Sequence, residues 1–178
     1  MLASAMNLLE SNLIEYSVTR VNPTRSGRHD NTISPFGVYR AKDGFIVVAA
    51  GNENIWRSLS AFLREHIAFD EALFSTNLMR LKNNITLTGI IEKVLGTYKV
   101  SYLEEKFLNL GIPCSRVNEM SDVASDMDNF KNKSLILLTH PKLGKCIVPG
   151  MPITFSEGIH ILPQKAPEIG ENNVEYGL

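Results

Sequence analysis

The stretch that decides the fold is "SPFGVYRAKDGFIVVAAGNENIW", residues 34–56. An alternating segment leads to Asp43-Gly44, and the apolar run "FIVVAA" returns from it. An Asp-Gly pair between two such runs predicts a two-residue hairpin turn in which both residues take positive φ. A returning strand that is apolar on both faces favours a central place in its sheet. Asn52 can cap a following helix, so the stretch predicts a hairpin joined directly to a helix.

The residues before the hairpin predict a helix and a loop. Apolar side chains recur every three or four positions near the N-terminus, which is the spacing of one helical face. They are Leu2, Met6, Leu9 and Leu13. Residues 21–34 are polar and rich in turn formers, as is typical of a linker or loop. We therefore expect one helix over residues 1–20 and a loop over residues 21–34.

The residues after the hairpin predict more helix. Residues 70–110 contain helical patterns with short breaks. Ser101 and Glu104 have the spacing of a capping box, which predicts the start of the last of these helices. Gly111 is placed to end that helix in a left-handed conformation.

The remaining residues predict a second small β-structure and an arm. "IPCSRV", residues 112–117, predicts a short strand, and its proline favours the edge of a sheet. We expect one short helix over residues 119–127. "SLILLTHPKLGKCIVPG", residues 134–150, predicts a second hairpin with its turn at His140 to Gly144. The proline-punctuated tail predicts an extended arm.

The composition excludes several classes of protein. Apolar residues make up 44% and charged residues 21% of the chain, as in ordinary globular domains. The net charge of −1 gives no electrostatic basis for binding nucleic acid. No apolar run approaches the roughly 20 residues that cross a bilayer, so we expect no membrane partner. Cys114 and Cys146 lack metal-ligand spacing, which favours reduced thiols in a cytoplasmic protein and predicts no metal site.

No self-contained catalytic motif is present in the sequence. There is no G-x-S-x-G, no phosphate-binding glycine loop, no H-E-x-x-H and no Cys/His cluster. His29 lies in the polar loop, where function often concentrates, although a hydrogen-bonded structural histidine is the more common role at such a position. Asp43 is explained by its turn, and Glu53 by the positive end of a helix dipole. The residues alone predict an α+β unit without a complete active site.

Several segments, taken in order, resemble the CoA-transferases of family III, the CaiB/BaiF type. "SPFGVYRAKDGFIVVAAGNENIWRSLSAFL" has that family's succession of Pro, aromatic, Tyr, Asp-Gly, apolar strand, Asn and aromatic. The other matching segments are "SGRHDNTIS", "LGIPCSRVNEMSDV", "THPKLGKCIVPGMPITFS" and "APEIGENN". The resemblance therefore extends over residues 1–178, and its ordered set of motifs is more specific than any one of them.

The resemblance implies that residues 35–155 form a small α+β domain within a larger enzyme. In the family, the N-terminal half forms a Rossmann-like large domain, to which the helix over residues 1–20 and a C-terminal arm over residues 156–178 would belong. Two such chains interlock as a homodimer, and each active site lies between the large domain of one chain and the small domain of the other.

The family's chemistry depends on an aspartate of the large domain. This aspartate attacks an acyl-CoA thioester, which gives a mixed anhydride and CoA thiolate, and the incoming carboxylic acid then exchanges on to CoA. Coenzyme A thioester is thus a substrate, and no permanently bound cofactor is implied. No aspartate of this chain matches the nucleophile, because the chain starts at the helix that follows it. We therefore expect the C-terminal part of a CoA-transferase, inactive without the N-terminal half.

The resemblance also suggests which residues face the active site. In this family the loop before the hairpin can close over the acyl-aspartyl intermediate and exclude water. The matching residues are Ser26, Gly27, Arg28, His29, Asp30 and Asn31. This chain lacks the glycine-rich version of the loop that some members have. The candidates on the small domain are Pro35, Tyr39, Asn52 and Glu53.

Two alternatives stay open. Related α-methylacyl-CoA racemases have a catalytic glutamate near the position of Asn52 and Glu53. The closer alignment places Asn52 there, which favours a transferase, whereas a shift of one residue would favour half of a racemase. The other alternative is a non-catalytic remnant, or a binding or assembly module, with the same fold.

Overall fold

The computed structural model describes residues 1–25, 27–153, 156 and 165–177. The protein is α+β, as the sequence predicts, and its described residues form helices and two small antiparallel sheets. The chain divides into two compact units, Met1–Val117 and Asn118–Leu178. The domain limits expected from the sequence stay a prediction. Among the described residues, no helix has both the length and the hydropathy of a membrane span.

A three-stranded antiparallel sheet organises the first unit, in the order β1–β2–β3. Its strands are β1 (Phe36–Arg40), β2 (Phe45–Ala49) and β3 (Cys114–Arg116). The central place of β2 and the edge place of β3 confirm the predictions. Tyr39 pairs with Ile46 on the buried face, and Val38 pairs with Val47 on the half-buried face. One face of the sheet therefore carries the core.

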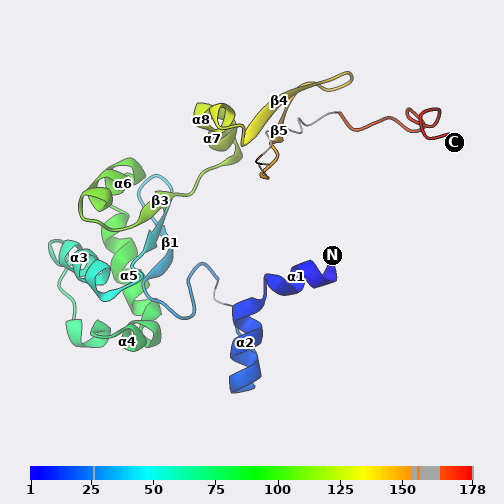
Figure 1. Ribbon diagram of the computed structural model, residues 1–178. Helices are drawn as coiled ribbons and strands as arrows, with labels where there is room; N and C mark the ends of the chain where they lie inside the picture. Colours follow the sequence, from blue (N-terminus) through cyan, green and yellow to red (C-terminus); the bar gives the residue numbers. More distant parts are fainter. Residues whose placement is uncertain (26, 154–155, 157–164, 178) are drawn as a thin grey trace. The chain divides into compact units, whose positions relative to one another are not determined.

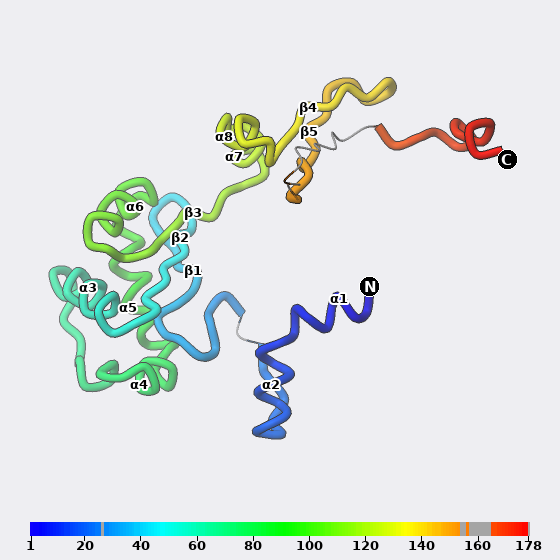
Figure 2. Tube along the Cα trace, viewed as in Figure 1, coloured from blue at the N-terminus to red at the C-terminus, as the bar shows by residue number. Residues whose placement is uncertain are grey.

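The helices that cover this sheet gather along one side of it (Figures 1 and 2). They are α3 (Glu53–Arg64), the 3-10 helix η1 (Glu71–Phe74), α4 (Asn77–Lys82), α5 (Asn84–Leu95) and α6 (Val100–Asn109). Helix α5 contacts β1, and α6 contacts β3. Leu59, Leu87 and Phe107, one from each of three helices, are fully buried. Burial of these apolar stripes against the sheet is the main source of stability in the unit.

The turn between β1 and β2 differs from the predicted two-residue type. Residues 41–44 connect the strands, and neither Asp43 nor Gly44 has a positive φ. The Asp43 carboxylate instead accepts a hydrogen bond of 2.8 Å from the amide of Val100. Asp43 thus caps the start of α6 from a distance in sequence, a role that a local turn pattern does not reveal.

The capping box predicted at Ser101 and Glu104 is wrong. Helix α6 begins at Val100, and its N-cap residue, Lys99, makes no side-chain cap. Glu104 lies further along the helix and accepts hydrogen bonds from the amide and the guanidinium of Arg116, at 3.0 and 2.6 Å. Its carboxylate therefore joins α6 to β3. At the helix end the prediction is confirmed, because Gly111 has a φ of 68°.

The N-terminal residues form two helices where the sequence predicts one. These are α1 (Leu2–Asn7) and α2 (Glu10–Thr19). Between them Leu9 takes φ −100° and ψ 10°, outside the helical region. The sequence has no proline or glycine at this break, and the apolar spacing continues across it. The pattern therefore predicts one helix where the structure has two. The residues of both helices are exposed throughout.

The described part of the second unit contains two short helices and a hairpin. They are α7 (Met120–Ser125), α8 (Met127–Lys131), β4 (Leu135–His140) and β5 (Gly144–Pro149). The one helix predicted over residues 119–127 is divided at Asp126, which has an extended backbone and accepts a hydrogen bond from the Asp128 amide at 2.9 Å. The hairpin is confirmed, and Gly144 closes its turn with a φ of 73°. Much of the predicted arm, residues 157–164 and 178, lies outside the described residues.

Candidate functional site

Part of the candidate loop lies along the free edge of β1 and extends the sheet. The Val38 amide donates a hydrogen bond of 2.9 Å to the Arg28 carbonyl. His29 pairs with Gly37 as an isolated antiparallel bridge. Residues 28–30 therefore behave as a short additional strand. The sequence did not predict it, because a polar stretch of turn formers carries no strand alternation.

Gly37 makes this close approach possible. A Cβ at this position would lie 2.5 Å from His29 Nδ1 and 2.6 Å from the Arg28 carbonyl oxygen. Because neighbouring residues of an antiparallel bridge point to the same face, the imidazole of His29 takes the space that a side chain on residue 37 would need.

A cluster of polar side chains surrounds His29. Its ring centroid lies 5.2 Å from that of Tyr39, which is fully buried. Within the described chain, neither His29 Nδ1 nor the Tyr39 hydroxyl has a hydrogen-bond partner. Burial raises the pKa of the Tyr39 hydroxyl, and the charge of Glu92 on α5 raises it further. Glu92 pairs with Arg28 at 2.8 Å and accepts the Arg40 amide at 2.9 Å.

These surroundings shift the pKa of two further groups. Burial and the neighbouring Arg28 charge lower the pKa of His29, against a smaller opposing effect of Glu92. Burial alone would raise the pKa of Glu92, but the hydrogen bonds from Arg40 and Arg28 outweigh it and lower that pKa. The cluster therefore favours a neutral imidazole beside an ionised carboxylate.

We expect the neutral state of His29 to make stability depend on pH. A base whose pKa is lower in the folded than in the unfolded chain binds its proton more readily after unfolding. The free energy of unfolding should therefore fall as pH drops below 6.5, the ordinary pKa of histidine. Urea unfolding between pH 7.5 and 5.5 measures this slope, and His29→Asn should reduce it. An unchanged slope in the variant would contradict a half-buried imidazole that stays neutral in the folded chain.

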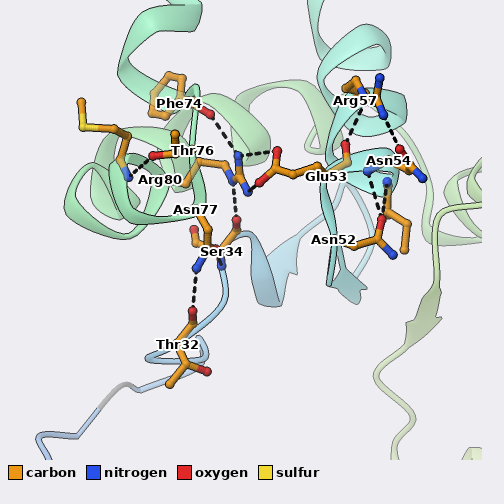
Figure 3. A network of polar contacts seen from close by, with 12 residues as sticks. Thr32, Ser34, Asn52, Glu53, Asn54, Arg57, Phe74, Thr76, Asn77 and Arg80 are labelled. Atoms are coloured by element: carbon orange, nitrogen blue, oxygen red, sulfur yellow. Dashed lines mark hydrogen bonds and ion pairs between the residues drawn. The ribbon is translucent and has the colours of Figure 1, made fainter.

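A second network joins the end of the loop to the start of α3 (Figure 3). The Arg80 side chain of α4 donates hydrogen bonds to the carbonyls of Ser34 and Phe74, at 2.6 and 3.1 Å. It also forms a bidentate pair with the carboxylate of Glu53, at 2.6 and 3.2 Å. Asn77 accepts the Ser34 amide at 3.0 Å. One arginine therefore fixes the loop end and the first turn of α3 together.

Sequence reasoning missed Arg80. A single arginine on a short helix resembles a solvated surface residue, and its acceptors come from three separate segments. The structure shows that Arg80 is 1% exposed and that its guanidinium lies 5.0 Å from the Trp56 ring. A buried arginine without a local partner in sequence is recognisable only once the chain has folded.

The loop candidates have different surroundings. Gly27 has a φ of 66°, which suits glycine at this point of the loop. Asn31 donates a side-chain hydrogen bond of 3.1 Å to the Thr24 carbonyl. Arg28 and His29 belong to the cluster beside β1, and Ser26 lies outside the described residues.

The small-domain candidates divide between the two networks. Tyr39 is in the core beside His29, and Pro35 is buried after a cis peptide bond with Ser34. Asn52 caps α3, as predicted, by accepting the amides of Asn54 and Ile55 at 3.0 Å each. Glu53 lies in the first turn, where the dipole favours it, and also binds Arg80. Together with Arg80, the loop candidates and these residues form the candidate site.

A pocket of about 790 Å³ adjoins the loop within the first unit. It is lined by loop residues 23–25 and 27–32, by one stretch of α2 and by β1 and β2. Its wall carries side chains of both charges, Arg25 and Arg28 beside Glu15 and Asp30, and Arg28 is already paired with Glu92. The described residues contain no group of three or more His, Cys, Asp or Glu side chains that could hold a metal ion.

Comparison with known proteins gives a consistent result. The family model of CoA-transferase family III matches residues 1–173. Succinyl-CoA:glutarate CoA-transferase of Mus musculus is 27% identical over 161 residues, covering 88% of this chain and 36% of that protein. Acetyl-CoA:oxalate CoA-transferase of Acetobacter aceti is 24% identical over 156 residues, covering 88% of this chain and 39% of that protein. The chain thus spans less than half the length of these relatives.

A solved structure shows the same fold. The CaiB/BaiF family protein from Brucella suis superposes with a TM-score of 0.75 at 24% identity, covering 96% of this chain and 44% of that one. The agreement of fold with a family match that runs through nearly the whole sequence shows that this chain belongs to CoA-transferase family III.

Proposed function

We propose that this chain is the C-terminal part of an enzyme that moves CoA from an acyl-CoA to a carboxylic acid. The reaction passes through an aspartyl-acyl anhydride, and the aspartate comes from a separate N-terminal part. A carboxylate oxygen attacks the thioester carbon, the carbon–sulfur bond breaks, and CoA leaves as a thiolate. The thiolate then attacks the aspartyl carbonyl of the anhydride, which releases the donor acid and leaves CoA as a thioester of the aspartate. The acceptor carboxylate attacks this thioester to form a second anhydride, and the CoA thiolate attacks the acceptor's carbonyl, which gives the product acyl-CoA and frees the aspartate. Residues 28–34 and the start of α3 form the wall that faces this chemistry.

The observation that carries the proposal is that each aspartate of this chain already accepts a hydrogen bond from another residue of the chain. They accept backbone amides at turns and helix starts, or, in one case, a lysine ammonium. They are Asp30, Asp43, Asp70, Asp122, Asp126 and Asp128. Hydrogen bonds from Thr32 also lower the pKa of Asp30, which makes it a weaker nucleophile. The family's reaction needs a nucleophilic aspartate, and each aspartate of this chain is already engaged. A nucleophile supplied by another part of the enzyme accounts for both observations.

The exposed apolar surface of α1 and α2 supports a further contact. Leu2 of α1 and Leu13 and Ile14 of α2 are 73%, 47% and 59% exposed. Many exposed large apolar side chains on a folded protein favour a site that another surface covers. We propose that the large domain of the complete enzyme covers it, and that two complete subunits form the homodimer in which each site is shared.

The geometry of Glu53 favours a transferase over half of a racemase. A racemase needs a carboxylate free to take a proton from the carbon next to the thioester carbonyl. Both oxygens of Glu53 bind Arg80 instead, and Asn52 Oδ1 is engaged as a helix cap. Neither residue is arranged as a base, so CoA exchange is the better-supported reaction.

We expect CoA exchange only when this chain is combined with the N-terminal part encoded upstream of it. The rate should exceed that of either part alone by at least about a thousandfold, because removal of a nucleophile abolishes covalent catalysis on that scale. The assay follows transfer from succinyl-CoA or acetyl-CoA to glutarate or oxalate, the pairs in the names of the two relatives.

The matched control is the same mixture with the upstream aspartate changed to alanine, which should be inactive. Hydroxylamine should trap the anhydride as a hydroxamate on the upstream part in the active mixture alone. Activity of this chain by itself would contradict the proposal. Folded, associated parts without exchange would instead identify a non-catalytic module of the same fold.

A further inference from the structure

We propose that Arg80 is a positioning residue that holds loop residues 28–34 against the first turn of α3. It would thereby keep the loop candidates and the Asn52–Glu53 pair in one fixed arrangement. The role of this arrangement in catalysis rests on the proposed function. The positioning itself is a property of this chain and can be measured without CoA.

The contacts of Arg80 lead to two different parts of the candidate site. Its Nε donates to the Ser34 carbonyl at 2.6 Å, at the end of the loop. Its two terminal nitrogens bind the Glu53 carboxylate, and one of them also binds the Phe74 carbonyl at 3.1 Å. Ser34 and Glu53 are joined through this single guanidinium (Figure 3).

The charge balance shows why an arginine is required. The Arg80 side chain is 2% exposed and that of Glu53 is 56% exposed, so the carboxylate at the helix start is held by a cation from the interior. A guanidinium can serve several acceptors in its plane, whereas a lysine ammonium is a compact point charge. The Trp56 ring, 5.0 Å away, adds a cation–π contact. Lysine should therefore replace Arg80 only in part.

The loop has few other anchors at this end. Asn77 accepts the Ser34 amide at 3.0 Å and donates to the Thr32 carbonyl at 2.7 Å. The Ser34 hydroxyl binds Asn84 at 3.2 Å. None of these contacts reaches α3. Loss of Arg80 would leave the loop tethered to α4 and α5 but detached from Glu53.

Amide hydrogen exchange on the 178-residue chain tests the proposal. The variants are Arg80→Met, which removes the cation, and Arg80→Lys, which keeps the charge without the fork. Arg64→Met is the matched control, because Arg64 pairs with Glu71 on the surface, at 46% and 60% side-chain exposure. Exchange in α6 reports the overall stability of the unit, and exchange over residues 30–38 and 53–56 reports local order.

We expect residues 30–38 to exchange at least about thirtyfold faster in Arg80→Met, relative to α6, and about threefold faster in Arg80→Lys. Arg64→Met should change neither region by more than about twofold. If the loop and α6 change by the same factor, Arg80 only fills the core and the proposal fails. If Arg80→Met does not fold, Arg80→Lys decides: exchange like the wild type over residues 30–38 would overturn the proposal.

Activity gives a second readout. In the combined enzyme, Arg80→Lys should lower kcat by about a hundredfold and change KM by less than about threefold, because misplaced groups cost rate more than binding. Normal kcat in a folded Arg80→Lys enzyme would contradict positioning at the active site. If the wild-type mixture transfers no CoA, the proposed function fails, and hydrogen exchange alone supports or overturns the role of Arg80.

Discussion

Replacing Phe107 by alanine is expected to lower the free energy of unfolding of the first unit by about 3–5 kcal/mol. The Phe107 ring is fully buried and meets Phe62 edge to face, with centroids 5.3 Å apart. It comes from α6, whereas Phe62 comes from α3, so the substitution removes an aromatic contact between two helices that cover the sheet. A cavity at this place cannot collapse without moving one of them.

Leu108→Ala is the matched control, because Leu108 follows Phe107 in the chain and its own side chain is 77% exposed. It should change the free energy of unfolding by less than about 0.5 kcal/mol. Urea unfolding of the full chain, followed by circular dichroism at several protein concentrations, measures both variants. Equal losses would mean that Leu108 is covered in solution, and a dependence on concentration would identify self-association. A large loss for Phe107 alone would show that the first unit folds around its own core.

Local signals in the sequence predicted much of the fold. Alternation and apolar runs predicted both hairpins and the central place of β2, because these patterns reflect which face each side chain takes. Asn52 was recognisable as a helix cap because the amides that donate to its side chain lie only two and three residues away. Gly111 was recognisable for the same reason. Each of these features depends on neighbours in the chain.

Contacts between distant segments could not be predicted in this way. Asp43 was assigned to a turn, but its carboxylate caps α6 at Val100, a residue that no turn pattern involves. Arg80 binds Ser34, which is 46 positions away in sequence. The candidate site depends on such contacts, so the sequence suggested several of its residues but not how they are held. The family resemblance supplied the expected chemistry, because no motif within the chain contains it.

The same distinction explains why the docking of the loop on β1 could not be predicted from the sequence. Its residues carry no strand pattern, yet residues 28–30 pair with β1 because β1 has an unpaired edge and a glycine at the point of closest approach. Exposed strand edges attract additional strands. The docked loop is therefore a property of β1 as much as of the loop itself.

Gly37→Ala is expected to separate this loop from β1 and to lower the free energy of unfolding by about 1–3 kcal/mol. The added Cβ would lie 2.5 Å from His29 Nδ1 and 2.6 Å from a backbone oxygen of Arg28, which cannot rotate away. Displacement of the loop would break the hydrogen bonds that Asp30 and Val38 make across the edge, each 2.9 Å. Trypsin cleavage after Arg28, identified by mass spectrometry, should accelerate because the released segment no longer forms part of the sheet.

The control for this effect is Gly89→Ala in α5, where an added Cβ meets nothing within 4 Å. Alanine there should raise the free energy of unfolding by about 0.5–1 kcal/mol, because glycine weakens a helix interior. The two substitutions add the same methyl group, so their opposite signs would separate the steric role of Gly37 from the general effect of removing a glycine. A stable Gly37→Ala chain with unchanged cleavage after Arg28 would mean that the loop does not dock on β1 in solution. The wall proposed for the active site would then have to form only when the N-terminal part of the enzyme binds.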